Sequence, residues 1–329
     1  MAESQEKESP AHEASSPSVT SEGAGMASRR TTLDLRTAVL LTLPPLFWAG
    51  NAVVGRALVG LFPPLALSFT RWLIAAAVLL PWVWPALWAQ RRALVAHWKL
   101  VTLVGALGIG CYNTFQYLAL QTSPAINVTL IAASMPVFVL ATGALFFGEP
   151  ARGGQWAGAA LSLAGVVWVL ARGEPARLLA FQFAPGDLIM LAANLTWTFY
   201  TWLLRTRRPD ISLGPFLAAQ IVVGTIAIAP LAAAEAVTGS VPITWNATTI
   251  GALAYVGIFP SLVAYYAWAR GVARVGAVLP IYFANLTPIF AGALSTLLLG
   301  ETPQVYHAVG LALIVAGIHL ASRQRSRGV

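Results

Sequence analysis

The feature that most constrains this chain is a series of long apolar stretches with almost no charged side chains inside them. One helix needs roughly 20 such residues to cross the hydrocarbon core of a bilayer. The 329 residues are 57% hydrophobic and only 10% charged, whereas charged residues make up about a quarter of a soluble domain. The sequence therefore predicts an all-α integral membrane protein.

Ten apolar stretches can be separated along the chain. We expect helices at residues 37–59, 63–86, 99–119, 124–147, 154–171, 187–204, 214–234, 247–269, 274–299 and 304–321. Residues 1–30 differ, because they are rich in Glu, Ser, Ala and Pro and cannot bury enough apolar surface to fold. They also lack the basic start, apolar core and cleavage site of a signal peptide. We therefore predict a disordered N-terminal tail followed by an uncleaved first helix.

Lysine and arginine in the loops predict how the helices insert, because cytoplasmic loops are enriched in both. With ten helices and a cytoplasmic N-terminus, the outside loops hold only Arg172 and Arg177, while Arg56 and Arg71 lie within spans. The remaining basic residues then fall on the inside. Both termini are thus expected in the cytoplasm. The net charge of +8 reflects this orientation, and we predict no nucleic-acid partner.

Two segments of the sequence repeat one another. The stretch PVFVLATGALFFGEP (136–150) and the stretch PIFAGALSTLLLGETP (288–303) both run from a proline to a Gly-Glu pair. A shift of 152 residues superposes Glu149 on Glu301. Each copy of this unit would hold five helices, so the second copy enters the membrane from the opposite face. The sequence predicts two inverted-topology five-helix repeats, a geometry typical of secondary transporters.

This repeat sets the expected organisation of the chain. The predicted segments are a disordered tail (1–30), a first five-helix repeat (31–172), a periplasmic connecting loop (173–186), a second five-helix repeat (187–321) and a basic C-terminal tail (322–329).

Several motifs resemble EamA-type members of the drug/metabolite transporter superfamily. They are FWAGNAVVGRAL (47–58), PPLALSFTRWLIAAAVLL (63–80), the two Gly-Glu helix ends, and GAALSLAGVVWVL (158–170) with GLALIVAGIHL (310–320). The resemblance covers about residues 37–321 and includes the bacterial aromatic amino-acid exporter branch of the family. It implies a secondary transporter of the bacterial cytoplasmic (inner) membrane that exports small metabolites, most readily apolar or aromatic amino acids. A nucleotide-sugar or other metabolite antiporter, or a drug efflux carrier, is the alternative.

Neutral polar and aromatic side chains are the candidate substrate-binding groups, because no Asp or Glu lies centrally in an expected span. Amides and phenols both donate and accept hydrogen bonds, so they can hold an ammonium and a carboxylate group. Aromatic faces attract cations as well. The alternative is that these side chains only join neighbouring helices. The candidates are Trp48, Asn51, Tyr112, Asn113, Gln116, Tyr117, Asn194, Trp197, Tyr265, Tyr266, Tyr282 and Asn285.

Two pairs of residues related by the repeat are candidates for gating. Pro136 and Pro288 interrupt helical hydrogen bonding and are candidate hinges, with a static kink as the alternative. Glu149 and Glu301 are candidate latches, with capping or loop packing as the alternative. We expect Arg71 to snorkel to the outer interface, as Arg56 does, although it could bind a substrate carboxylate.

The sequence disfavours other classes of protein. It shows no constellation of His, Cys, Asp and Glu suited to a metal or a nucleophile, so we predict no enzyme, no metal and no cofactor. A gated pore would need polar residues from face to face, whereas these concentrate at mid-depth. The expected partners are a small-molecule substrate and the lipid bilayer, and two halves in one chain favour a monomer.

Overall fold

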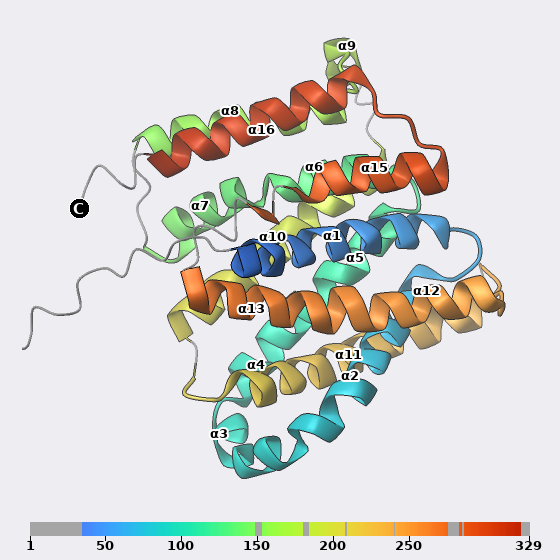
Figure 1. Ribbon diagram of the computed structural model, residues 1–329, viewed down its shortest axis with the longest axis vertical. Helices are drawn as coiled ribbons and strands as arrows, with labels where there is room; N and C mark the ends of the chain where they lie inside the picture. Colours follow the sequence, from blue (N-terminus) through green and yellow to red (C-terminus); the bar gives the residue numbers. More distant parts are fainter. Residues whose placement is uncertain are drawn as a thin grey trace, which may run out of the picture. The chain divides into compact units, whose positions relative to one another are not determined.

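The structure is a computed structural model that describes residues 35–148, 153–179, 184–207, 209–239, 241–275, 283–284 and 286–323. All of them belong to the unit Leu33–Val329. Every regular element in these ranges is a helix (Figure 1). The predicted tail at 1–30 and most of the C-terminal tail lie outside the described residues.

The first part of the chain forms both long and broken helices. They are α1 (Leu35–Ala57), α2 (Pro64–Ala89), α3 (Arg91–Ala96), α4 (Trp98–Val104), the π-helix η2 (Gly105–Cys111), α5 (Tyr112–Ala119), α6 (Ala125–Ala133), α7 (Met135–Phe146) and α8 (Gly153–Leu170). Helices α1, α2 and α8 agree closely with the expected stretches. The expected helix at 99–119 instead changes to a π-helix in its middle, and the one at 124–147 is bent by 45° between α6 and α7.

The second part repeats this mixture. Its helices are α9 (Pro175–Leu179), α10 (Pro185–Arg207), α11 (Leu213–Thr238), α12 (Ala247–Ile258), the π-helix η3 (Phe259–Val263), α13 (Ala264–Val275), α15 (Thr287–Leu299) and α16 (Val305–Arg323). Helices α10, α11 and α16 follow the expected stretches. The short helix α9 lies inside the expected connecting loop at 173–186.

Several helix ends follow from local sequence. Helix α2 begins at Pro64, which has no backbone N–H. The first N–H groups of a helix have no intrahelical acceptor, so proline loses no hydrogen bond there. The side chain of Asn246 caps α12 by accepting a hydrogen bond from the Thr249 N–H at 2.8 Å. Helices α11 and α15 end at Gly239 and Gly300, whose positive φ angles of 64° and 68° are readily adopted by glycine.

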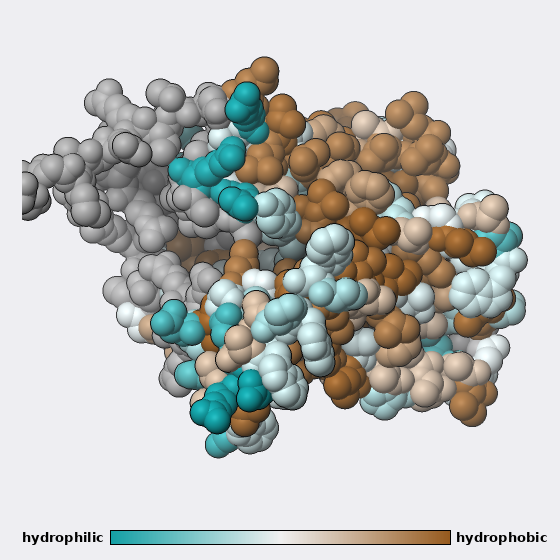
Figure 2. Space-filling view, turned by 60° about the horizontal axis from the view of Figure 1, so that its bottom comes forward, coloured by the Kyte–Doolittle hydropathy of each residue, from teal (hydrophilic) through white to brown (hydrophobic). Residues whose placement is uncertain are grey.

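Four described helical stretches are long and apolar enough to cross a membrane. They are Leu35–Ala57, Pro64–Ala89, Leu213–Thr238 and Ala247–Trp268, and the bent pair α6 and α7 would be a fifth. Large apolar side chains such as Trp82 and Leu297 are strongly exposed. One face of the molecule carries a broad hydrophobic area, with hydrophilic side chains gathered toward one side (Figure 2). A membrane protein is therefore supported, while the ten-helix inverted repeat stays a prediction.

The principal helix pairs each join a helix before residue 172 to one after residue 184. These pairs are α8 with α16, α2 with α11, α1 with α15, α5 with α10, and α1 with α13. Figure 1 shows α8 and α16 side by side along most of their length. A core of buried residues including Val53, Tyr117, Met190 and Val256 lies where α1, α5, α10 and α12 meet. This packing surrounds the candidate site.

Glycines allow the closest of these approaches. A Cβ atom on Gly165 of α8 would lie 2.8 Å from the carbonyl oxygen of Gly310 on α16. One on Gly317 of α16 would collide with the carbonyl oxygen of Gly158 on α8. Because the early residue of α8 meets the late residue of α16, the two helices run antiparallel. Small residues at such contacts are typical of membrane helix pairs.

Candidate functional site

Arg71 is buried at the centre of a hydrogen-bonded network. Its side chain is 1% exposed. Its Nε donates to Ser261 Oγ at 2.6 Å, and its Nη1 donates to Asn113 Oδ1 at 2.6 Å and to Asn51 Oδ1 at 3.0 Å. These acceptors come from η3, α5 and α1. The guanidinium group therefore takes neutral oxygens from three other elements in place of water.

This burial shows that the expectation of a snorkelling Arg71 was wrong. Snorkelling requires a path along the helix surface to water. The turn of α2 that carries Arg71 and Trp72 packs inward, and both side chains are fully buried. Arg56 differs, because its side chain near the end of α1 remains partly exposed.

Two further candidate residues complete the network around Arg71. Tyr117 accepts a hydrogen bond from Arg71 Nη1 at 3.1 Å, and its hydroxyl donates to Asn51 Oδ1 at 2.6 Å. The side-chain amide of Asn51 also donates to Gln116 Oε1 at 2.8 Å. We call these residues the polar network: Asn51, Arg71, Asn113, Gln116, Tyr117 and Ser261.

Four other candidates form an aromatic cluster beside this network. The ring centroid of Trp197 lies 4.8 Å from that of Tyr112 and 6.4 Å from that of Tyr265. The ring of Trp48 lies 6.4 Å from that of Tyr265. Trp72 joins the two groups, because its ring is 6.0 Å from Tyr265 and 4.8 Å from Arg71 Cζ. We call these residues the aromatic cluster: Trp48, Trp72, Tyr112, Trp197 and Tyr265.

The two remaining candidates that the structure describes, Asn194 and Tyr266, do not join either group. Asn194 is buried and donates from Nδ2 to the carbonyl oxygen of Ile131 at 2.8 Å, so it ties α10 to the end of α6. Tyr266 is 57% exposed, and Arg270 Cζ lies 5.2 Å from its ring centroid. Two candidates, Tyr282 and Asn285, lie outside the described residues.

Of the two candidate latches, Glu301 forms an ion pair. Its Oε1 lies 3.5 Å from Arg56 Nε, so it connects the end of α1 to the segment after α15. Arg56 Nη1 also donates to the carbonyl oxygens of Leu120 at 2.8 Å and Gln121 at 3.3 Å. The repeat-related Glu149 lies outside the described residues.

The two candidate hinge prolines occupy equivalent places in their helices. Pro136 lies in the first turn of α7 and Pro288 in the first turn of α15. A proline there leaves no intrahelical hydrogen bond unmade. Pro136 follows the bend between α6 and α7, so it stands at a helix start and does not interrupt a continuous helix.

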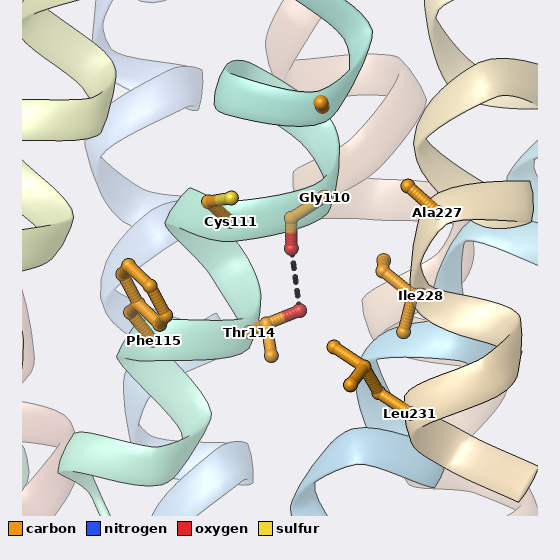
Figure 3. A pocket seen from close by; sticks show the side chains of 8 residues that line it. Gly110, Cys111, Thr114, Phe115, Ala227, Ile228 and Leu231 are labelled. Atoms are coloured by element: carbon orange, nitrogen blue, oxygen red, sulfur yellow. Dashed lines mark hydrogen bonds between the residues drawn. The ribbon is translucent and has the colours of Figure 1, made fainter.

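An apolar pocket lies near the polar network, between η2 and α5 on one side and α11 on the other (Figure 3). Its volume is about 80 Å³, below the roughly 300–1,000 Å³ of ligand sites. Thr114 at its edge donates to the Gly110 carbonyl at 2.5 Å and lies 2.8 Å from Ser68 Oγ. This pocket is too small to hold an organic substrate. In the described part of the chain no three His, Cys, Asp or Glu side chains are placed to hold a metal ion.

Arg71, Trp72 and Ser261 belong to these two groups but are not among the candidate substrate-binding residues that the sequence predicts, and carboxylate binding by Arg71 was only the alternative to snorkelling. A charged residue inside an apolar span is by itself a signal of function, so Arg71 could have been included. Ser261 and Trp72 carry no comparable signal, because small hydroxyls and tryptophans are frequent in membrane helices.

The chain belongs to the EamA-like transporter family, which matches residues 35–171 and again residues 184–323. An uncharacterized transporter of Archaeoglobus fulgidus is 28% identical, over 89% of this chain and 99% of its own. A probable terminal-alkyne amino-acid exporter of Streptantibioticus cattleyicolor is 27% identical, over 86% and 92%. The uncharacterized inner membrane transporter YedA of Escherichia coli K12 is 25% identical, over 84% and 87%.

A solved crystal structure shares this fold. It superposes with a TM-score of 0.55 at 24% sequence identity, and the match covers 89% of this chain and 98% of the other. The class of protein is therefore a membrane transporter of the EamA-like family, with a polar network and an aromatic cluster at its centre.

Proposed function

We propose that this protein is a secondary carrier that exports small metabolites, namely amino acids with apolar or aromatic side chains. The observation that carries this is the contact between the polar network and the aromatic cluster. One group offers hydrogen bonds for the polar end of an amino acid, and the other offers flat apolar surface for its side chain. The name of the Streptantibioticus relative, an amino-acid exporter, supports the same class of substrate.

Alternating access between two inverted halves is the mechanism that we propose. Two features support it: the family matches the chain twice, and the principal helix contacts join the two matched parts. The antiparallel pairing of α8 with α16 is what inverted copies of one helix would give. Under this proposal the domain boundaries are those expected from the sequence, a single chain holds the pathway, and both termini face the cytoplasm of a bacterial inner membrane.

The test is counterflow in proteoliposomes. Vesicles containing the purified protein are loaded with one unlabelled amino acid, and entry of labelled L-phenylalanine is followed without an ion gradient. We expect transient accumulation with apolar and aromatic amino acids. Tyr112→Ala and Asn113→Ala should lower the initial rate at least tenfold, because each removes a side chain from the site. The control Trp82→Ala alters a tryptophan that is 84% exposed and should leave the rate unchanged.

The same assay separates the alternatives. If no amino acid exchanges, even with a proton gradient imposed, the proposed substrate class is wrong. Exchange of a nucleotide sugar in its place would favour an antiporter of that class. One observation argues against a nucleotide sugar as substrate. Among the described residues, Arg71 is the only cation in the polar network, whereas the diphosphate of a nucleotide sugar carries several negative charges.

A further inference from the structure

Arg71 is a buried cation with no acidic partner among the described residues. The carboxylates in those ranges lie elsewhere: Glu301 pairs with Arg56, and Glu174 pairs with Arg177. Glu235 accepts the backbone N–H groups of Leu65 and Ala66 at the start of α2. Asp187 and Asp210 have no contact with Arg71. Charged groups inside membranes are costly and normally paired, so this unpaired charge needs a reason.

The network engages Nε and Nη1 of the guanidinium group and leaves Nη2 without a described partner. Nε and Nη1 donate to Ser261, Asn113, Asn51 and Tyr117, whereas Nη2 makes no hydrogen bond to a described residue. The neighbouring Trp72 is fully buried, and its Nε1 is also without a hydrogen-bond partner in the described structure. A buried N–H group without a partner, such as Trp72 Nε1, is rare in proteins and calls for an acceptor. Nη2 of Arg71 is likewise a donor with no hydrogen bond to a described residue, so one acceptor group would match both.

We infer that Arg71 anchors the carboxylate of the substrate, with Trp72 Nε1 as a second donor, while the aromatic cluster receives the apolar side chain. This deepens the proposed function and rests on it. Asn51, Asn113, Tyr117 and Ser261 act as positioning residues, because they fix Nε and Nη1 and so orient Nη2. A carboxylate accepts such charge-assisted hydrogen bonds strongly.

The inference includes a specificity rule. The polar network carries a fixed positive charge and no carboxylate, so the protein recognises the carboxylate of an amino acid more strongly than its ammonium group. A ligand that keeps the aromatic ring and the carboxylate should bind without an ammonium group. One that keeps the ring and the ammonium group should bind weakly.

The experiment uses three ligands of one shape: L-phenylalanine, 3-phenylpropionate, which lacks the ammonium group, and phenethylamine, which lacks the carboxylate. Their dissociation constants are measured by titration calorimetry on the purified full-length protein. For the wild type we expect 3-phenylpropionate to bind within about tenfold of L-phenylalanine, and phenethylamine at least about tenfold more weakly.

Variants then assign the effect to Arg71. Arg71→Gln should weaken binding of the two carboxylate ligands by about tenfold to a hundredfold and leave binding of phenethylamine unchanged. Asn113→Asp keeps Arg71 but places a carboxylate at the position that Nη1 contacts, so it should weaken the carboxylate ligands and strengthen phenethylamine. The control Arg91→Gln alters an exposed arginine stacked 4.6 Å over the ring of Trp88 and should change nothing.

The outcomes distinguish this inference from the proposed function. Equal weakening of all three ligands in Arg71→Gln would mean a structural role only, and tight wild-type binding of phenethylamine would also overturn the inference. If L-phenylalanine exchanges but its binding is unaffected in both variants, the inference fails while the proposed function stands. If no amino acid exchanges and 3-phenylpropionate still binds through Arg71, the proposed function fails while the carboxylate anchor stands. Should Arg71→Gln not fold, the wild-type series and Asn113→Asp decide.

Discussion

Two buried asparagines show that residue type alone does not define the role of a side chain. Asn113 and Asn194 are both almost completely buried amides in apolar helices. Asn113 accepts a hydrogen bond from Arg71, whereas Asn194 donates one to a backbone carbonyl at the end of α6. The sequence predicts both as substrate-binding residues. Only their partners separate a site residue from a helix contact.

The ion pair between Arg56 and Glu301 gives a prediction about single residues. Glu301→Gln removes one partly exposed ion pair and should cost about 0.2–1 kcal/mol. Arg56→Gln also leaves the carbonyl oxygens of Leu120 and Gln121 without their donor, so it should cost about 1–3 kcal/mol in total. Thermal unfolding in detergent should therefore show a larger loss for Arg56→Gln.

The control for this comparison is Arg177→Gln. Arg177 of α9 pairs at 2.7 Å with Glu174, which directly precedes that helix, but both side chains are more exposed than Glu301 and the pair is local. Of the three variants, Arg177→Gln should lower the melting temperature least. A loss in Glu301→Gln as large as in Arg56→Gln would contradict the additional role of the Arg56 backbone contacts.

At the scale of elements, two of the helical stretches that supply the polar network contain a π-helix beside it. The π-helix η2 ends at Cys111, two residues before Asn113, and η3 contains Ser261 itself. Pro260 lacks the N–H that a regular helix would use there. In addition to accepting from Arg71, Ser261 donates to the Val256 carbonyl at 2.7 Å. Such π-helical turns occur frequently at functional sites, and hydropathy cannot reveal them because it does not depend on which carbonyl each backbone N–H contacts.

The contact between α8 and α16 supplies a prediction about elements. Gly165→Leu would place a side chain against the backbone of Gly310 and the side chain of Ile314, at 2.8 and 2.9 Å from its Cβ. Overpacking of this kind costs about 1–3 kcal/mol, so the variant should unfold at a lower temperature or at a lower denaturant concentration.

Gly251→Leu is the matched control, because nothing lies within 4 Å of a Cβ at Gly251 on the exposed side of α12. It should be neutral or slightly stabilising, since leucine favours a helix more than glycine does. Equal destabilisation by the two substitutions would show that the close approach of α8 and α16 is not what limits stability.

At the scale of the whole molecule, the packing joins the two parts that the family matches. Helices α1, α2, α5 and α8 each find a principal partner after residue 184. A carrier with two halves that move against each other would keep its site at this boundary. Arg71 on α2 and Ser261 on η3 do meet across it.

Topology provides the whole-molecule prediction. Ten spans place the C-terminus in the cytoplasm, so a C-terminal green fluorescent protein should fluoresce and a C-terminal alkaline phosphatase should be inactive. A phosphatase fused within 173–186 should be active, because the first five helices end outside. An active phosphatase at the C-terminus would require either an odd number of spans or an N-terminus outside, and would refute ten helices with both termini in the cytoplasm.

The sequence alone determined the membrane class, the helical secondary structure, the bounds of long helices such as α1 and α16, and the family, because these follow from hydropathy and local motifs. It also indicated most of the polar network and the aromatic cluster, since these residues recur at helical spacing. Only the tertiary structure decided that Arg71 is buried, that Asn194 and Tyr266 stand apart from the site, and that two helices bulge beside it. Those outcomes depend on which side chain of a distant helix meets a given atom, and periodicity along one chain segment does not contain that information.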